Sequence, residues 1–424
     1  MSNPKSGLVS VVLVNFRGAQ DTLACIRELL AVDWPADLLE IVVVDNASGD
    51  DSLEQLHTVD DPRVRIVESP ENTGFAGGSN LGARSAKGEI VAFLNNDARP
   101  DRRWIAEAVA TFDSRPEIGA VASKVLDWEG ERVDFVDAAV TWYGMGYKPH
   151  TGETDREEWS TERDVLFGTG AAMFVRREVF EELGGFDESY FMFYEDVDFG
   201  WRLNLAGYRF RFQPRSLAFH KHHASMKEFG SYREEFLLER NALATLYKNL
   251  DDDSLARVLP GALLLAVRRA VSRGELDSSA LDLRNRGNEA ELSMPVAKSA
   301  MAGLFAIDRF VDGLGDLDAK RAQIVIAALE GAFNGTVAHL HLRNLGHPLF
   351  PAAVPRGQFL AIRVDERRRR RAYCLIAGYR REDCAPLAVW RDRDPVREGV
   401  LGDVRSRCLD KSALPDILPD PMNG

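Results

Sequence analysis

Cysteine is scarce in this chain of 424 residues. Its four cysteines, Cys25, Cys374, Cys384 and Cys408, are widely spaced and include no C-x-x-C pair. A zinc ribbon needs paired cysteines and a small disulfide-stabilised secreted domain needs many, so the sequence excludes both classes. We therefore expect the protein to work in a reducing, cytoplasmic compartment.

Long hydrophobic runs are also missing. The chain has no uninterrupted apolar run of 18 residues, and its start lacks an apolar stretch behind a basic segment. A membrane-spanning helix needs about 20 mainly apolar residues, and a secretory signal needs a basic segment followed by an apolar one. We expect neither membrane spanning nor secretion.

Positive charge is deficient in the N-terminal half. Residues 1–250 carry 27 Lys and Arg against 42 Asp and Glu, whereas residues 251–424 carry 26 against 24. Because a nucleic-acid-binding surface needs a basic face, we expect no nucleic-acid partner. The run Arg367 to Arg371 is most simply a solvated surface. The alternative is peripheral association with an anionic membrane or a lipid-linked acceptor at the inner face of the membrane.

Short β-branched runs alternate with helix-like stretches in the first 120 residues. The runs cover residues 9–14, 39–45, 64–69 and 89–95, and the second is continuously apolar, as in a strand buried on both faces. This alternation predicts an α/β fold with an open, mostly parallel, Rossmann-like sheet flanked by helices.

The pattern changes beyond about residue 250, where helical texture dominates. We therefore expect a catalytic domain over residues 1–250 and a mainly helical domain with a mixed tail over residues 251–424. The second domain is expected to pack on the first, where it helps to form an acceptor site or a contact in a homo-oligomer.

Polar residues follow all four predicted strands. Asn15 ends the first strand and Asp45 the second, a glycine-rich stretch over residues 72–80 follows the third, and Asn95-Asn96-Asp97 follows the fourth. Parallel sheets bind ligands outside the carboxyl ends of their strands, so these residues predict one polar crevice.

Asp97 is the first candidate for chemistry. A carboxylate at the end of a central strand can hold a divalent ion, which can neutralise a diphosphate. The alternative is that Asn95-Asn96-Asp97, with Pro100, only caps a turn. A second carboxylate pair, Glu195-Asp196, lies in an aromatic-rich segment and favours the catalytic interpretation.

A set of segments between residue 9 and about residue 225 occurs in the order typical of one enzyme family. These segments are VVLVNF, IVVVDNASGDDS, ENTGFAGGSNLGA, FLNNDARP, FGTGAAMFVRREVFEELGGFDESYFMFYEDVDFGWRLNLAGYRFRF and LAFHKHH. Together they resemble the family 2 glycosyltransferases with the GT-A fold. The likeness is strongest to non-processive bacterial members that transfer rhamnose, galactofuranose and similar sugars. The Q-x-x-R-W motif of the processive synthases is not found.

The resemblance implies roles for the strand ends. Asn15 and Asp45 would meet the nucleotide base of the donor, and Asn95 and Asn96 would lie near its ribose. Asn95 stands where the family commonly has the first carboxylate of an Asp-x-Asp motif, so one ligand is lost. Asp97 keeps the last position and would hold Mn²⁺ or Mg²⁺ against the sugar diphosphate.

The glycine-rich stretch is neither a Walker loop nor a Gly-x-Gly-x-x-Gly motif. The resemblance assigns it to the donor pocket, with Asn72, Gly78 and Asn80 as contacts. The alternative is a tight connection without a binding role.

Asp196 matches the family's Glu-Asp motif and would remove the proton from the acceptor hydroxyl, while Glu195 would orient the acceptor. The alternative is that Asp196 is the N-cap of the following helix, and the two roles can coexist. Asp198 is interpreted as a structural or solvated charge.

His220 would complete the metal site, because some family members place a metal-binding imidazole at this point. Mn²⁺ accepts mixed carboxylate and imidazole ligands. A lone histidine is more often structural, and His222 and His223 follow closely, so the choice among the three stays open.

Taken together, the residues and the resemblance predict an inverting, metal-dependent hexosyl- or deoxyhexosyltransferase for polysaccharide or cell-wall biosynthesis. Its donor would be a nucleotide-diphosphate sugar of the UDP or dTDP type, and its acceptor a hydroxyl of a cell-surface glycan or a lipid-linked saccharide. One alternative is a sugar nucleotidyltransferase, although the basic, glycine-rich signature of that class does not follow the first strand. The other is a non-catalytic glycan-binding scaffold on the same fold.

Overall fold

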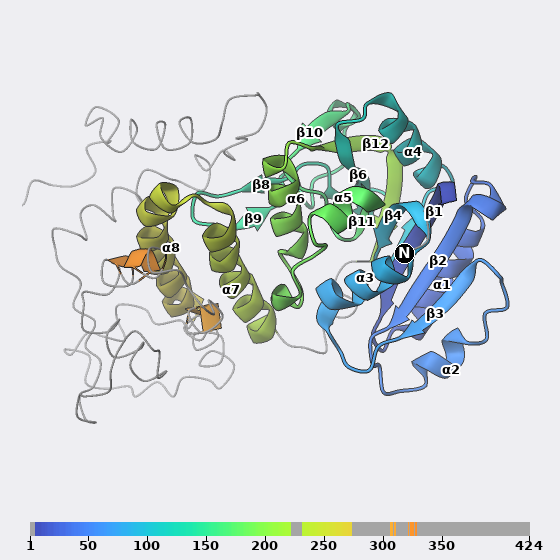
Figure 1. The fold of residues 1–424 in the computed structure, drawn as a ribbon, viewed down its shortest axis with the longest axis horizontal. Coiled ribbons are helices and arrows are strands. Elements are labelled where there is room, and N and C mark those ends of the chain that lie inside the picture. The colour runs from blue at the N-terminus through green and yellow to red at the C-terminus, as the bar shows by residue number, and fades with distance from the viewer. Residues whose placement is uncertain are drawn as a thin grey trace, which may run out of the picture. The chain divides into compact units, whose positions relative to one another are not determined.

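The computed structural model describes residues 5–221 and 231–273, together with residues 306, 307, 309, 310, 321, 323–325, 327 and 328 (Figure 1). The chain divides into two compact units. The first comprises Met1–Ala139 and Gly146–Asn241, and the second comprises Val140–Met145 and the chain from Ala242. The predicted domain boundary at residue 250 stays a prediction. The Arg367 to Arg371 run and the three C-terminal cysteines lie outside the described residues.

The strands form one large sheet and one two-stranded ribbon. Their bounds are β1 (Lys5–Asn15), β2 (Leu39–Asp45), β3 (Val64–Glu68), β4 (Gly88–Leu94), β5 (Ala98–Pro100), β6 (Ile118–Asp127), β7 (Val133–Phe135), β8 (Ala139–Val140), β9 (Gly146–Tyr147), β10 (Arg163–Val165), β11 (Ala172–Arg176) and β12 (Arg209–His220). The ribbon pairs β8 with β9, and the other strands belong to the large sheet.

The large sheet has the order β10-β12-β6-β11-β4-β1-β2-β3, with β5 and β7 beside β12 and β6. Strands β1 to β4 pair in parallel, β6 and β12 are parallel to each other, and β11 runs antiparallel between β4 and β6. Every residue of β2 is buried, as the continuous apolar run predicted. In register, Asn15 pairs with Asp45 and Asp45 with Glu68, so the polar strand ends share one edge.

The helices are α1 (Ala19–Leu30), α2 (Ser52–Leu56), α3 (Gly74–Ser85), α4 (Trp104–Ser114), α5 (Arg177–Glu182), α6 (Glu195–Leu205), α7 (Ser231–Asn249) and α8 (Asp252–Arg273). Short 3₁₀ turns are η1 (Ala36–Leu38), η2 (Glu157–Trp159) and η3 (Glu188–Tyr190).

Helices cover both faces of the sheet. On one face Phe93 of β4 packs against Phe180 of α5 and Phe186, with ring centroids 5.2 and 4.9 Å apart. On the other face Phe174 of β11 packs against Trp104 of α4 at 4.4 Å. Successive strand residues point to opposite faces, so this aromatic packing gives the sheet a core on each side. The expected α/β class with helices flanking the sheet is confirmed. The sheet is mixed rather than mostly parallel, because β5, β7, β10 and β11 join it through antiparallel pairs.

From Ala242 onward, the described part of the second unit is mainly helical. In α8 a buried stripe at helical spacing is formed by Leu255, Leu259, Ala262, Leu263 and Ala266. The expected helical texture beyond residue 250 is therefore confirmed for this segment. Among the described residues, each helix is too short or too polar to cross a bilayer.

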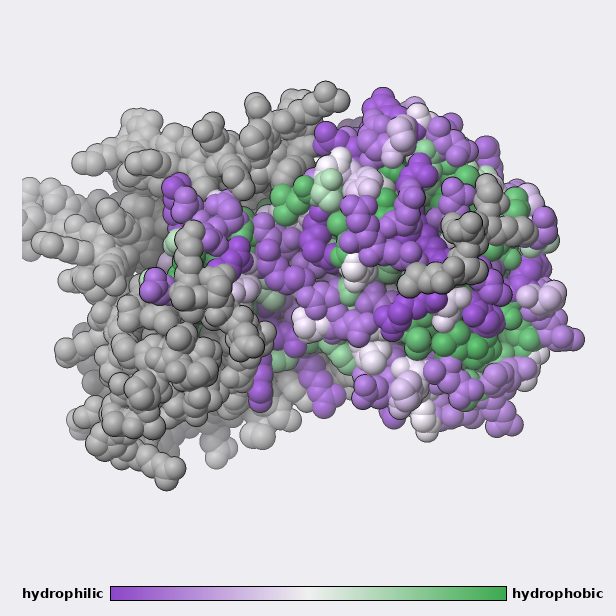
Figure 2. Space-filling view, viewed as in Figure 1, coloured by the Kyte–Doolittle hydropathy of each residue, from purple (hydrophilic) through white to green (hydrophobic). Residues whose placement is uncertain are grey.

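The visible face of the first unit is mostly hydrophilic, with smaller hydrophobic areas between polar ones (Figure 2). Leu205 is the one large hydrophobic side chain that is strongly exposed in the described part of the chain. Such a surface gives no sign of a large apolar contact face in this unit.

Candidate active site

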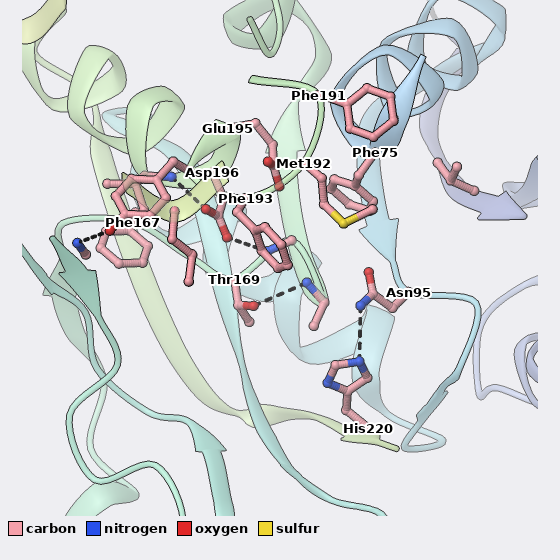
Figure 3. A pocket seen from close by; sticks show the side chains of 18 of the residues that line it. Phe75, Asn95, Phe167, Thr169, Phe191, Met192, Phe193, Glu195, Asp196 and His220 are labelled. Carbon is pink, nitrogen blue, oxygen red and sulfur yellow. Dashed lines mark hydrogen bonds between the residues drawn. The ribbon is translucent and has the colours of Figure 1, made fainter. Parts of the chain in front are cut away.

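A cavity of about 350 Å³ lies in the first unit, at the polar edge of the sheet (Figure 3). Seven of the sequence-predicted site residues line it: Asn72, Asn95, Asn96, Asp97, Glu195, Asp196 and His220. Four others lie outside its lining: Asn15, Asp45, Gly78 and Asn80. The fold thus brings residues that are more than 100 positions apart in sequence around one cavity.

Asp97 and His220 meet in this cavity. The Nε2 atom of His220 lies 3.1 Å from Oδ1 of Asp97 and 3.1 Å from Nδ2 of Asn95. The meeting follows from strand pairing, because β12 is antiparallel to β5 and sets His220 opposite Ala98. Both side chains are about nine-tenths buried.

Two residues that the sequence did not reveal complete this cluster. Asp134 of β7 contacts the other ring nitrogen of His220, with Oδ2 2.8 Å from Nδ1. Lys148, which follows β9 and lines the cavity, forms an ion pair with Asp134. Neither residue lies in a recognisable motif, so only the folded chain identifies them.

The pKa of His220 reflects this surrounding. Burial alone lowers the pKa of the imidazole, but the hydrogen bonds to Asp134 and Asp97 outweigh it and raise the value to about 9. Burial raises the pKa of Asp97, but the hydrogen bond and charge of His220 outweigh this effect and leave the value below the ordinary one. A buried carboxylate therefore stays ionised at the cavity wall.

The donor set at Asp97 fits a divalent ion that also binds substrate. A carboxylate oxygen and an imidazole nitrogen converge, and a carboxylate holds the second ring nitrogen, as is usual for a metal-binding histidine. Because the raised pKa keeps the imidazole protonated at neutral pH, a bound ion would displace the proton from Nε2. Among the described residues no cluster of three or more His, Cys, Asp or Glu could hold a metal. A bound ion would thus take further ligands from a diphosphate and water. His222 and His223, the alternatives to His220, lie outside the described residues.

Asn15 and Asp45 are buried and do not line the cavity. Nδ2 of Asn15 donates to Oδ1 of Asp45 (2.8 Å) and to Oγ of Ser48 (3.1 Å), while Thr22 donates to Oδ1 of Asn15 (2.8 Å). Residues next to them, Val14, Phe16 and Asn46, reach the cavity instead.

Asn46 and Asn72 form a second polar group at the cavity wall. Nδ2 of Asn46 donates to Oδ1 of Asn72 (3.1 Å) and to the carbonyl of Gly74 (2.9 Å). Asn72 Oδ1 also accepts from the backbone N–H of Gly74 (2.9 Å). These bonds fix the start of α3 against the end of β2.

Most of the glycine-rich stretch is helical, because Gly74–Ser85 forms α3. A Cβ on Gly78 would lie 2.9 Å from Val14, so this glycine lets the helix approach β1. Asn80 bonds the backbone of Phe186 through both amide atoms and donates to Glu188. It lines a different cavity, of about 310 Å³.

Glu195 and Asp196 begin α6, and Figure 3 shows them on a different part of the cavity from Asn95 and His220. Oδ2 of Asp196 accepts from the N–H of Gly170 (3.0 Å), and Oδ1 accepts from the N–H of Val197 (2.8 Å). The N-cap is Tyr194 in the left-handed conformation. The alternative that Asp196 is the N-cap is therefore wrong: the helix starts two residues earlier than expected.

Burial raises the pKa of both carboxyls. For Glu195 the raised pKa comes from burial and then from the charge of Asp196, and its Oε2 atom is buried without a hydrogen-bond partner. For Asp196 burial outweighs the N–H donors of Gly170 and Val197 and the positive charge of Lys148, so its pKa is also raised. A carboxyl with a raised pKa is suited to proton transfer near neutral pH.

Asp198 has a structural role, as one interpretation of the sequence held. It is fully buried and accepts from Nε of Arg202 (2.8 Å), which in turn donates to the carbonyls of Leu183 and Gly185. This network ties α6 to the segment that follows α5.

Glu195→Gln is expected to raise thermal stability at neutral pH. The pKa of Glu195 is higher in the folded chain than the ordinary value, so the unfolded chain ionises more readily than the folded one. Glu195 therefore lowers the free energy of unfolding at any pH above the ordinary value. Removing the charge should add about 0.5–2 kcal/mol to the free energy of unfolding. Thermal melts from pH 4 to 8 should show the gain growing with pH. The exposed Glu178→Gln is the control, and an equal gain in both variants would contradict the assignment.

The sheet and the acidic, metal-compatible cavity at its carboxyl edge define an α/β protein built to bind a polar ligand. Comparison with known proteins names the family. Residues 10–184 match the model of "Glycosyl transferase family 2". This part of the chain therefore resembles the family 2 glycosyltransferases, as its motifs predicted.

Three relatives illustrate the similarity. The chain is 32% identical over 208 residues to the O-antigen biosynthesis protein RfbC of Myxococcus xanthus, which covers 47% of this chain and 16% of that protein. It is 27% identical to the pre-mycofactocin glycosyltransferase of Mycobacterium tuberculosis, over 54% of this chain and 46% of that protein. It is 28% identical to the N-acetylglucosaminyl-diphospho-decaprenol L-rhamnosyltransferase of the same species, over 48% and 72%. The match thus spans less than half the length of the first two relatives.

Solved structures also resemble the chain at low identity. The mannosyltransferase PcManGT from Pyrobaculum calidifontis, in complex with GDP-Man and Mn²⁺, is 18% identical with a TM-score of 0.42, over 82% of this chain and 87% of that chain. GalNAc-T7 with UDP, GalNAc and Mn²⁺ is 17% identical with a TM-score of 0.48, over 56% of this chain and 47% of that chain.

Proposed function

We propose that the chain is an inverting, metal-dependent glycosyltransferase. It moves a hexose or deoxyhexose from a nucleotide-diphosphate sugar, of the UDP or dTDP type, to a hydroxyl of a cell-surface glycan or a lipid-linked saccharide. The observation that carries this proposal is the cavity that Asp97 and His220 share with Glu195 and Asp196. In this proposal the cavity would hold the diphosphate and supply the base for the acceptor.

The proposed division of labour follows from the surroundings of each carboxylate. Mn²⁺ or Mg²⁺, when bound at Asp97 and His220, would neutralise the charge that grows on the leaving diphosphate. Asn95 and Asn96, beside Asp97 on the same wall, would contact the donor, with Asn72 further along. Asn15 and Asp45, which do not line the cavity, would fix the floor of the base and ribose site through their hydrogen bond. Gly78 and Asn80 would act by setting the position of α3.

Asp196 would accept the proton of the acceptor hydroxyl. The hydroxyl oxygen forms a bond to the anomeric carbon as the bond from that carbon to the diphosphate oxygen breaks, and the diphosphate leaves with the electron pair. Attack on the face opposite the leaving group inverts the configuration. The N–H donors of Gly170 and Val197 would hold the carboxylate oriented while it works.

The acceptor class is supported by the relatives. One carries O-antigen biosynthesis in its name, and another a diphospho-decaprenol-linked sugar. A lipid-linked acceptor agrees with peripheral association at the inner face of the membrane. Both that association and a homo-oligomer stay part of the proposal.

A thermal-shift panel of UDP-, dTDP- and GDP-sugars, each with and without Mn²⁺, tests the proposal. A bound donor raises the apparent stability by mass action, so we expect a shift with one nucleotide and only in the presence of the ion. A donor-hydrolysis assay then separates an enzyme from a glycan-binding scaffold. No shift with any donor, or no turnover of the donor that binds, would contradict the proposal.

A further inference from the structure

The segment between η3 and α6 has an unusual backbone at the cavity wall. Phe191 has φ 65° and ψ −60°, and the N–H of Met192 donates to the carbonyl of Tyr190 at 2.7 Å. These values describe a classic γ-turn centred on Phe191, which is a rare and strained turn. The two aromatic residues that follow, Phe193 and Tyr194, also have positive φ, of 66° and 71°.

Strained backbone persists only where its surroundings hold it in place. Phe191, Met192, Phe193 and Tyr194 all line the cavity, and Glu195 follows directly. In Figure 3 Met192 and Phe193 lie beside the two carboxylates. The conformation of this segment, here called the aromatic turn (residues 190–194), therefore sets where the carboxylates lie.

Asn241 of α7 binds three backbone carbonyls of the aromatic turn. Its side-chain amide lies within hydrogen-bond distance of the carbonyls of Tyr190 (3.2 Å), Met192 (2.9 Å) and Phe193 (2.7 Å). Only 1% of Asn241 is exposed, so these bonds form away from water, where they are strongest. The neighbouring Arg240 adds donors to the carbonyls of Ser189 (2.9 Å) and Tyr190 (2.8 Å).

The start of α3 holds the same turn from another side. The N–H of Ala76 donates to the carbonyl of Phe191 (3.1 Å). A Cβ on Gly74 would lie 2.0 Å from that carbonyl oxygen, so only glycine lets the two segments meet. The aromatic turn thus connects the asparagines at the start of α3 with the carboxylates of α6.

We propose that Asn241, assisted by Arg240, is a positioning residue for catalysis. It keeps the aromatic turn in its strained conformation, which places Asp196 and Glu195 at the cavity wall. Its own amide points to the backbone carbonyls of the turn, so it acts through the turn. The inference rests on the proposed glycosyltransferase activity, because it assigns Asp196 its role.

The chain offers a matched control on the same helix. Asn249 is also buried, and its amide donates to the carbonyl of Thr245 within α7. Asn241→Ala and Asn249→Ala therefore each remove one buried amide, but only the first removes bonds to the aromatic turn. Asn241→Leu fills the space of the asparagine without its donors.

We expect Asn241→Ala and Asn241→Leu to lower kcat by about 10–100-fold, the loss that a small misplacement of a catalytic group causes. The KM of the donor should change little. The acid limb of the pH–rate profile should move to lower pH, because a carboxyl released from its buried position loses its raised pKa. Asn249→Ala should show none of these changes. Full activity of Asn241→Leu would overturn the inference, since packing alone would then suffice.

Hydrogen exchange of the backbone amides in residues 189–196 gives a readout that does not depend on activity. Exchange should be faster in both Asn241 variants than in the wild type or Asn249→Ala. Unchanged exchange would overturn the inference and leave the proposed function intact. A wild-type protein with no transfer activity would instead overturn the proposed function. Exchange would still show whether Asn241 holds the aromatic turn in place.

Discussion

Asp196→Asn is expected to lower kcat by about 10²–10⁴-fold, which is the usual contribution of a positioned general base. The amide cannot accept the proton of the acceptor hydroxyl. Donor affinity should stay close to that of the wild type, because the proposed mechanism assigns this carboxylate to the acceptor. Steady-state kinetics with a saturating acceptor, together with a donor-binding measurement, check both statements.

The dependence of activity on pH provides a second test of the role of Asp196. A base works only when ionised, and burial raises the pKa of Asp196, so wild-type activity should fall on the acid side at a pH above the ordinary aspartate range. Glu195 and Asp196 titrate as a pair, so the fall of activity at acid pH reports on both carboxyls. In Asp196→Asn the residual activity should lose most of this fall. Asp164→Asn, on β10 outside the cavity, is the control and should keep the wild-type profile.

Asp97→Asn is expected to raise the concentration of Mn²⁺ needed for half-maximal activity by at least ~10–100-fold. Loss of a residue that only hydrogen-bonds to a metal ligand already lowers metal affinity by this factor, and Asp97 is proposed to bind the ion itself. The substitution keeps the size of the side chain and removes the charge that faces His220 at 3.1 Å. Affinity for the donor should fall in parallel, since in the proposed mechanism the ion would link the protein to the diphosphate. An activity titration with Mn²⁺ measures the change.

Asp101→Asn is the matched control for this substitution. Its carboxylate accepts from the N–H of Arg103 (2.9 Å) before α4 and does not line the cavity. We expect a wild-type metal requirement for this variant. Unchanged metal dependence in Asp97→Asn, or full wild-type activity in excess chelator, would contradict the metal assignment.

The strand ends were predictable because their signal is local. The apolar run before Asp45 and the one before Asp97 each predict a buried strand, and parallel strands end at the same edge of a sheet. The structure places Asp45 at the end of β2 and Asp97 after β4, and Asp97 lines the cavity whereas Asp45 does not. Which side chain of a strand end reaches the cavity depends on packing between elements, which no local pattern records.

Helix boundaries were less predictable. The polar pair before VDFGWRLNLAG suggested a cap at Asp196, but Tyr194 takes the left-handed conformation and the helix begins at Glu195. This start depends on contacts of the aromatic turn with α3 and α7, which are remote in sequence. Tertiary contacts thus overrode the local preference for an aspartate cap.

Asp134, Lys148 and Asn241 escaped the sequence analysis for a related reason. Asp134 and Asn241 act through partners far along the chain, since Asp134 is 86 positions from His220 and Asn241 is 48 positions from Phe193. Lys148 joins the cluster through Asp134. A carboxylate, an ammonium or an amide in a single sequence carries no mark of such a partner. Only the fold brings these groups together.

Calorimetric titration of the nucleotide sugar in the presence of Mn²⁺ tests the division between donor and acceptor carboxylates most directly. The wild type, Asp97→Asn and Asp196→Asn are titrated side by side. We expect Asp196→Asn to bind the donor as the wild type does and Asp97→Asn to bind it at least ~10-fold more weakly, which separates the two roles. Equal loss of donor binding in both variants, or normal binding in both, would contradict a site in which Asp97 holds the donor through an ion and Asp196 serves the acceptor.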